Sequence, residues 1–531
     1  MLTTDGFEKP MEKQGFHSTK TVIDIGNAQI KGIVGEINYS GTNDQLSVSV
    51  LKYKEIESGG LVRSEITAEY DLISAVAVVL DALRVSERPV DKVSIGLGGA
   101  AFKTARATNR LVTEYQAKTL TEEDIEDFYK KAQRELLSPG DRVIHREMYN
   151  IRVNDKPTAS PVGRVADTLR ADVYFIYMEE AAYRRYEDLF RKIPDGPAIE
   201  RIMANGYTAA MALLRNEEKN AGVILADIGW GTTDIVIFKR NWLLDFESIP
   251  FGMMHFILDL CKLPQFINYK DGEQRYTAKS TISQEYAEEL LELYIQNKIG
   301  AKETFFKETV YCRGEYILEL IAMRCEHIAE EIKKVLPNLN KDLKKGIILT
   351  GGGSRIYGLA EKIKEKTGHS VVCNALPFFR FHGLPEVDER MAAVIGLFGE
   401  AIEAEYERAL KAGFLETDGD TAQPVESDRQ PGLPDQGAST GDPKIDEPGT
   451  EQTGAQTGTG GEEEPFVPPQ DIPPSVSDQP TGDDIDEAFQ NILGNRPSEK
   501  KKPEPKSSED KRKIKDKVKI WWQNIKENYM D

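Results

Sequence analysis

Apolar and polar positions alternate with two different periods between about residues 19 and 409. The alternation in TVIDIGNAQIKGIVGEI (21–37) predicts two strands joined by a glycine turn, whereas DLISAVAVVLDALRV (71–85) has the period of a helix. The unbroken apolar runs in GVILADIG (222–229) and GIILTGGG (346–353) are typical of strands buried on both faces. The pattern therefore predicts an α/β fold whose sheets are covered by helices on both sides.

One interval breaks this regular order. Between about residues 90 and 172 the pattern predicts a strand pair, a helix in LTEEDIEDFYKKAQRELL (120–137), and two further strands separated by a Pro/Gly loop. Thr121 is placed to cap the helix, with Asp124 three residues later. The interval is therefore predicted to be a small inserted α+β subdomain.

The periodic pattern ends near residue 409. The chain carries 88 acidic and 68 basic residues, a net charge of −20, and the acidic excess is concentrated in a Gly-, Pro- and Thr-rich stretch. Such a composition buries too little apolar surface to fold, so residues 410–510 are predicted to form a disordered acidic linker. Within it, Ile485, Phe489, Ile492 and Leu493 share one helical face, so this segment is either one that folds on a partner or a chance amphipathic patch.

The last residues have a different character. In KRKIKDKVKIWWQNIKENYMD (511–531) a helix would carry lysines on one face and an apolar stripe on the other, made of Ile514, Val518, Trp521, Trp522, Ile525 and Tyr529. Two tryptophans opposite a basic face favour a helix that lies in the lipid headgroup plane. The alternatives are docking on the chain's own body or on a calmodulin-type or nucleic-acid partner.

Charge and hydropathy restrict the possible partners. The folded part lacks the basic footprint that binding to nucleic acid needs, so no nucleic-acid partner is expected. No run of about 18 uncharged apolar residues occurs, so any membrane contact is expected to be peripheral. The four cysteines and six histidines lack the spacing of a metal site.

Three turns carry the candidate chemistry. Asp24-Ile25-Gly26-Asn27-Ala28 and Asp227 to Asp234 each join two strands through a tight turn whose N–H groups can face phosphate oxygens. The strand-end residues Asp24 and Asp227 can hold Mg²⁺ through water, and Asp227 is the candidate catalytic carboxylate. The third turn, Thr350 to Ser354, has three glycines that would let a ring and ribose lie against backbone. Taken singly, each turn is also compatible with an ordinary hairpin or connection.

All three turns in this order resemble the actin/heat-shock-70/sugar-kinase superfamily, in which two halves clamp ATP. The inserted subdomain and the tail are similar to those of the FtsA family, the bacterial cell-division actin homologues. The resemblance covers about residues 19–409 and the tail. It implies ATP and Mg²⁺ as cofactors, self-association into filaments, and a peripheral position on the cytoplasmic face of the membrane at the division site. Its implied partners are membrane lipids, the C-terminal peptide of FtsZ and later division proteins.

The resemblance also implies a division of the chain and a set of nucleotide contacts. The expected segments are a loose N-terminus (1–18), subdomain 1A (19–89 and 173–221), the insert 1C (90–172), subdomain 2A (222–261 and 336–409), subdomain 2B (262–335), the linker (410–510) and the membrane-targeting helix (511–531). The expected nucleotide-binding residues are Asp24, Gly26, Asn27, Ala28, Lys31, Gly229, Gly231, Thr232, Thr233, Gly351, Gly352, Gly353 and Ser354.

The sequence departs from the FtsA pattern at several positions. Trp230 stands where the family usually has a glycine, and Gln29 where a phosphate-contacting lysine is common. An indole inside the cleft would occupy the volume of the γ-phosphate, so we expect Trp230 to project outward. Because of Trp230 and Gln29, we expect nucleotide binding to be retained and hydrolysis to be slow or absent. The segment ISQEYAEELLELYI (282–295) shows no clear nucleoside contact. A pilus-assembly protein of the PilM kind, which generally lacks such a tail, and a small-molecule kinase are the alternatives.

Overall fold

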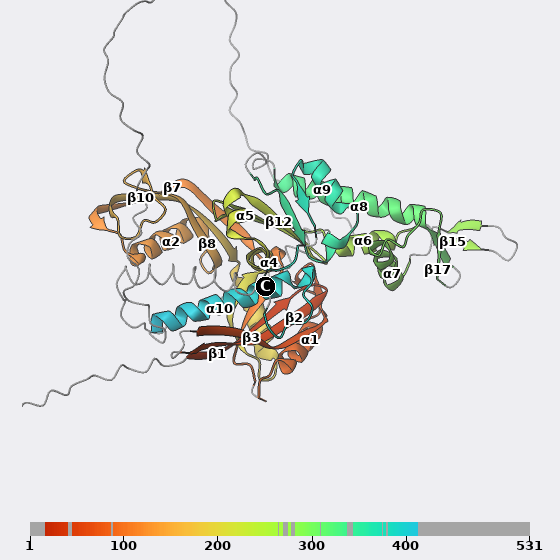
Figure 1. Cartoon of the computed structure of the whole chain (residues 1–531), viewed down its shortest axis with the longest axis horizontal. Helices are drawn as coiled ribbons and strands as arrows, with labels where there is room; N and C mark the ends of the chain where they lie inside the picture. The colour runs from red at the N-terminus through yellow and green to blue at the C-terminus, as the bar shows by residue number, and fades with distance from the viewer. Residues whose placement is uncertain are drawn as a thin grey trace, which may run out of the picture. The chain divides into compact units, whose positions relative to one another are not determined.

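The computed structural model describes ten segments of the chain: residues 16–40, 45–86, 89–263, 265–268, 274–277, 282–307, 310–336, 343–373, 375–378 and 381–412 (Figure 1). The predicted terminal helix and the Ile485–Leu493 segment lie outside these residues, as does the linker beyond Ala412. In the described part of the chain, no helix is both long and apolar enough to cross a membrane.

The first half is built on a five-stranded sheet. Its strand order is β11-β6-β1-β2-β3, with bounds Ala198–Ala204, Lys92–Leu97, Phe16–Ile25, Gln29–Ser40 and Gln45–Glu57. β1, β2 and β3 form an antiparallel meander, whereas β6 and β11 run parallel to β1. The mixed order arises because the meander needs only short turns, while the parallel strands return through longer crossovers.

Helices cover both faces of this sheet. Ile23 packs in the cluster that contains residues of α1 (Glu69–Ala82), while its neighbour Val22 packs with residues of α10 (Ala392–Ala412). Successive side chains of a strand point to opposite faces, so the apolar run of β1 supplies both cores. Figure 1 shows α10 beside β1 and α1 beside β2.

The second half repeats this plan. Its sheet has the order β14-β13-β12-β19-β20, with bounds Trp242–Ile249, Thr233–Lys239, Val223–Ile228, Ile347–Thr350 and Val371–Val372. β12, β13 and β14 form the antiparallel meander, and β19 and β20 run parallel to β12. Two halves with the same strand order and directions give the duplicated actin-like fold that the sequence predicts.

The insert lies between β6 and β11. It contains β7 (Lys103–Thr119), α2 (Glu122–Leu136), β8 (Arg142–Val153), β9 (Lys156–Pro157) and β10 (Val165–Met178), with the sheet order β7-β10-β8-β9. Thr121 caps α2 as predicted: its hydroxyl accepts from the Asp124 N–H, and the Asp124 carboxylate accepts from the Thr121 N–H. The chain then passes through α3 (Glu180–Lys192) to β11.

The remaining elements of the second half surround its sheet. α6 (Met253–Leu260) follows β14, and α9 (Leu359–Thr367) lies between β19 and β20. A small sheet of order β16-β15-β18-β17 and the helices α7 (Gln284–Ile295) and α8 (Gly314–Val335) lie within residues 262–335. The small strands are β15 (Gln265–Asn268), β16 (Gln274–Thr277), β17 (Thr304–Lys307) and β18 (Val310–Arg313). The chain passes from the first half to the second through α4 (Asn205–Leu213) and α5 (Asn216–Ala221). The last helix, α10, returns from the second half and packs on α4 and β1.

Candidate functional site

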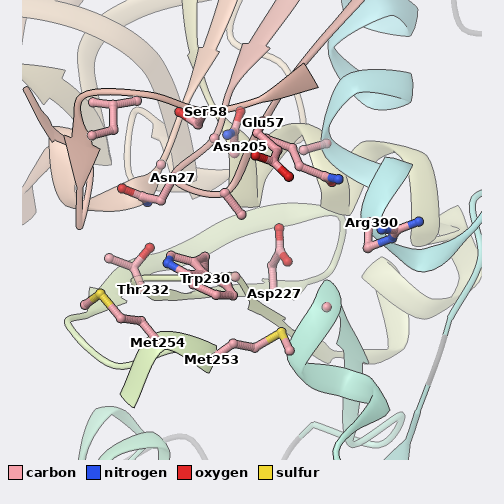
Figure 2. Close-up of a pocket in the computed structure, with 18 of the residues that line it drawn as sticks. Asn27, Glu57, Ser58, Asn205, Asp227, Trp230, Thr232, Met253, Met254 and Arg390 are labelled. Carbon is pink, nitrogen blue, oxygen red and sulfur yellow. The ribbon is translucent and has the colours of Figure 1, made fainter. Parts of the chain in front are cut away.

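The turns of the β1–β2 and β12–β13 hairpins face one cavity of about 800 Å³. Both halves line it, as do the glycine turn after β19 and the helix α7 (Figure 2). The structure thus brings together three turns that are spread over more than three hundred residues of the chain. Nine of the predicted residues line this cleft: Asp24, Gly26, Asn27, Ala28, Lys31, Asp227, Gly229, Thr232 and Gly352.

The turn of the first hairpin is closed tightly. The Gly26 N–H donates to the Gln29 carbonyl at 3.1 Å, and a Cβ on Gly26 would lie only 2.7 Å from that oxygen. The side chain of Asn27 is tied to the small hairpin of β4 (Leu61–Val62) and β5 (Glu65–Ile66). Its amide nitrogen lies 3.3 Å from the Ser64 hydroxyl, and its oxygen accepts from the Ser64 N–H.

The second hairpin has the same turn geometry. The Gly229 N–H donates to the Thr232 carbonyl at 2.9 Å, and the pairs Asp24–Lys31 and Asp227–Asp234 occupy the same register of their hairpins. Two predicted contacts of this turn do not line the cleft. Gly231 lies against the backbone of Arg63, and the buried Thr233 donates its hydroxyl to the Phe251 carbonyl at 2.7 Å.

The expectation that Trp230 projects outward is wrong. The residue lines the cleft, and Figure 2 shows its side chain between Thr232 and Asp227. The reason lies in the following helix: α6 begins directly behind the turn, and its Met253 and Met254 N–H groups donate to the carbonyls of Gly229 and Trp230 at 3.0 and 2.8 Å. With its backbone held there, the half-buried indole packs on the apolar core of the second half and toward the cleft.

Asp24 is almost completely buried at the end of β1. It accepts a hydrogen bond from the Asn205 side-chain amide at 2.7 Å and pairs across the hairpin with Lys31. Burial raises the pKa of Asp24, and the Lys31 charge and the Asn205 bond partly offset that rise. The Asn205 oxygen is buried and has no hydrogen-bond partner within the described residues.

The second hairpin places two acids opposite each other. Burial raises the pKa of Asp227 to about 8, and the nearby charges of Asp234 and Asp24 add to the rise. Burial also raises the pKa of Asp234 to about 6, although this carboxylate accepts hydrogen bonds from Ser248 at 2.7 Å and from the Gly99 N–H at 2.9 Å. A bound cation beside Asp227 would favour the ionised carboxylate, so this site can bind Mg²⁺ although the pKa of Asp227 is raised.

The third turn supports the second hairpin from behind. Gly351 has a φ of 76°, and a Cβ there would lie 2.3 Å from a carboxylate oxygen of Asp227. Gly353 lies against Ile228, and the buried Ser354 hydroxyl donates to the Gly351 carbonyl at 2.7 Å. Of the four predicted residues of this turn, only Gly352 lines the cleft. The other three hold the turn and the Asp227 strand together.

Sequence reasoning missed one wall of the cleft. One face of α7 lines it with Gln284, Glu288, Glu292 and Ile295, while Leu290 and Leu291 pack in the core. Arg355 continues this wall, 3.8 Å from the carboxylate of Glu292 and 3.5 Å from that of Glu389. The spacing of four between the first three residues is the signal that was available in the sequence. Arg390, just before α10, lines the cleft as well.

The residue set fits a magnesium-bound nucleotide. Glycine turns leave the backbone open to phosphate oxygens, two buried strand-end carboxylates suit a hydrated Mg²⁺, and the unpartnered Asn205 oxygen can accept from a metal-bound water. The α7 wall adds carboxylates that can accept from ribose hydroxyls. Asp24 and Asp227 would hold the metal, and the three turns would hold the nucleotide.

The sequence is similar to those of several known proteins. The MreB/Mbl protein family matches residues 199–380, from β11 to just beyond β20. A cell division protein FtsA from Borreliella burgdorferi is 22% identical over 383 residues, covering 71% of this chain and 89% of the relative. The FtsA of Pseudomonas aeruginosa is 23% identical over 368 residues, covering 67% and 82%. The chain is a diverged relative of the FtsA proteins.

The similarity to FtsA extends to further bacteria. FtsA of Streptococcus pneumoniae is 21% identical over 373 residues, covering 67% of this chain and 75% of the relative. Among solved structures, a chain of the PilM-PilN type IV pilus biogenesis complex aligns with a TM-score of 0.45 at 15% identity, covering 72% of this chain and 98% of that one. MreB5 of Spiroplasma citri bound to AMPPNP aligns with a TM-score of 0.37 at 14% identity, covering 74% and 98%.

Proposed function

We propose that the protein is a cell-division adaptor that binds an adenine nucleotide with Mg²⁺ in its cleft. In this role it joins the C-terminal peptide of FtsZ to lipids on the cytoplasmic face of the membrane at the division site. It also self-associates and recruits later division proteins, while hydrolysis is slow or absent.

The observation that carries this proposal is the extent of the similarity to FtsA. Relatives named cell division protein FtsA from Borreliella burgdorferi and Pseudomonas aeruginosa are matched over 89% and 82% of their length, so the likeness is not confined to one motif. The nucleotide part of the proposal has independent support, because the three turns expected to hold a nucleotide converge on one cleft. The membrane part rests on the amphipathic sequence of residues 511–531 alone.

A vesicle sedimentation assay tests the membrane step. The full chain is mixed with vesicles containing anionic lipid, and its double variant Trp521→Glu/Trp522→Glu serves as the loss-of-binding form. We expect the full chain to sediment with the vesicles and the variant to stay in the supernatant, because two carboxylates cannot enter the headgroup boundary at low cost. A Trp242→Glu variant is unsuitable as a control because Trp242 packs on the core, so Tyr70→Glu, which changes an exposed residue, is used instead.

Addition of FtsZ tests the partner step. FtsZ should sediment with vesicles only when the full chain is present, and FtsZ without its C-terminal peptide should not. Sedimentation of the double variant to the same extent as the full chain would overturn the membrane step. Failure of FtsZ to follow the bound chain would overturn the adaptor role and leave a nucleotide-binding relative of FtsA with another partner.

A further inference from the structure

The two hairpin turns are bridged on one side by the β4–β5 hairpin. The Asn27 side chain of the first turn is bonded to Ser64, and the adjacent residue Arg63 lies against Gly231 of the second turn. A Cβ on Gly231 would lie 3.0 Å from the Arg63 Cα, so backbone meets backbone at this point. The Arg63 guanidinium also reaches His255 at 2.9 Å in the second half. These contacts tie both turns to the same short hairpin.

The two turns carry side chains of very different size directly after the closing glycine. Asn27 and Trp230 occupy equivalent turn positions, since each follows the glycine that closes its turn. Asn27 is small and its polar atoms are taken by Ser64, whereas Trp230 brings an indole into the cleft. No hydrogen bond to the indole N–H occurs within the described residues. An aromatic side chain buries about 150–250 Å², so the indole reduces the space that the two turns leave for phosphoryl groups.

The indole cannot swing away at low cost. Its backbone carbonyl accepts from the Met254 N–H at 2.8 Å, and the glycine before it accepts from the Met253 N–H at 3.0 Å. A Cβ on Gly252 would lie 2.6 Å from the carbonyl oxygens of both Gly229 and Trp230, so α6 is packed directly on this turn. The ring itself packs against the core of the second half. Moving the turn would break two hydrogen bonds of the helix start and expose apolar surface.

We propose that Trp230 makes the cleft selective for a nucleoside diphosphate over a nucleoside triphosphate. The proposal rests on the proposed nucleotide binding and specifies its ligand. The glycine turns and the two metal-binding carboxylates remain available to a diphosphate with Mg²⁺, and the free indole N–H can donate to its terminal oxygen. A third phosphoryl group would meet the ring. Trp230 is therefore a specificity-determining residue, and slow or absent hydrolysis follows from the weak binding of the triphosphate.

Equilibrium binding to the full chain tests the proposal. Affinities for Mg-ADP and for the non-hydrolysable triphosphate Mg-AMPPNP are measured by calorimetry for the unsubstituted chain, Trp230→Gly and Trp230→Phe. We expect the unsubstituted chain to bind Mg-ADP at least tenfold more tightly than Mg-AMPPNP. Trp230→Gly should bring the two affinities within about threefold of each other, because it removes the ring at a position of the turn that tolerates glycine. Trp230→Phe keeps most of the bulk and should keep most of the preference.

The outcomes separate this proposal from the function on which it rests. Equal affinities in the unsubstituted chain, or a preference that Trp230→Gly leaves unchanged, would overturn the selectivity while leaving nucleotide binding in place. Binding of neither nucleotide by the unsubstituted chain and by Trp230→Gly would overturn both. Circular dichroism melting checks that each variant is folded. If Trp230→Gly does not fold, the unsubstituted chain and Trp230→Phe decide the question. Loss of the preference for Mg-ADP in Trp230→Phe, with unchanged affinity for Mg-ADP, would contradict steric selection by a large ring.

Discussion

The two hairpins have the same strand register and the same turn hydrogen bond, but one pairs an acid with a base and the other pairs two acids. In the first, Asp24 faces Lys31 across the strands, and Asn27 at the turn is bonded to Ser64. In the second, Asp227 faces Asp234, and the equivalent turn position holds Trp230. Like charges directly opposite each other are destabilising, and both acids of the second hairpin have raised pKa values. In the first hairpin, the charge of Lys31 therefore compensates the buried carboxylate. In the second hairpin, the two carboxylates need a bound cation or protons to compensate their charges.

The largest expected effect concerns the support of the second hairpin. Gly351→Ala should lower the free energy of unfolding by roughly 3 kcal/mol or more, because the new Cβ meets Asp227 at 2.3 Å and φ is 76°. Gly368→Ala is the matched control, since Gly368 also has a φ of 76° but nothing within 4 Å of its Cβ position. It should cost only about 1 kcal/mol. Equal losses in urea unfolding would show that contact with Asp227 is unimportant.

The next effect concerns the compensation within the first hairpin. Lys31→Met should lower the free energy of unfolding by about 2 kcal/mol at pH 8, because the buried Asp24 loses a neighbouring positive charge. The double variant Lys31→Met/Asp24→Asn should recover most of the loss, since no buried carboxylate then lacks a counter-charge. If the double variant is no more stable than Lys31→Met, the pair is not coupled.

Removing a carboxylate from the second hairpin should raise the free energy of unfolding instead of lowering it. The folded pKa of Asp227, about 8, lies above its ordinary value of 3.8, so the folded state binds the proton more tightly. Stability from this group is present below about pH 4 and is lost as the pH rises toward 8. Asp227→Asn should therefore be more stable than the unsubstituted chain at pH 8 and not at pH 4, as measured by nucleotide-free thermal melting. A difference that is independent of pH would contradict this assignment.

The smallest effect concerns the tie of the first turn. Asn27→Ala removes the acceptor for the Ser64 N–H and should lower the free energy of unfolding by about 1 kcal/mol. Because Asn27 is held by Ser64, the selectivity between di- and triphosphate should change less than in Trp230→Gly. A larger change in selectivity for Asn27→Ala would mean that the first turn, and not the second, sets the room for phosphate.

Local signals predicted much of the fold and part of the site. The alternating run around Asp24 gives the first hairpin, and Thr121 with Asp124 gives the start of α2, because hairpin register and helix capping are decided by neighbouring residues. The direction of the Trp230 side chain could not be predicted from neighbouring residues. It depends on α6 packing behind the turn, a contact between segments whose relation only the folded chain defines.

The glycine turn shows the same limit. Its three glycines mark a close approach, but the sequence does not say what approaches, and the structure shows Asp227 and Ile228 against Gly351 and Gly353. The α7 wall could have been found from the spacing of Gln284, Glu288 and Glu292. The spacing does not show that this face of α7 points toward the cleft. That orientation depends on which face of α7 packs on the core, and only the tertiary structure shows it.

The most direct test of the account is hydrogen–deuterium exchange of the full chain with and without saturating Mg-ADP. If both hairpins and the glycine turn hold one ligand, protection should appear together in peptides covering residues 24–31, 227–234 and 351–354. Protection confined to one hairpin, or absent from all three segments, would contradict a nucleotide clamped between the two halves.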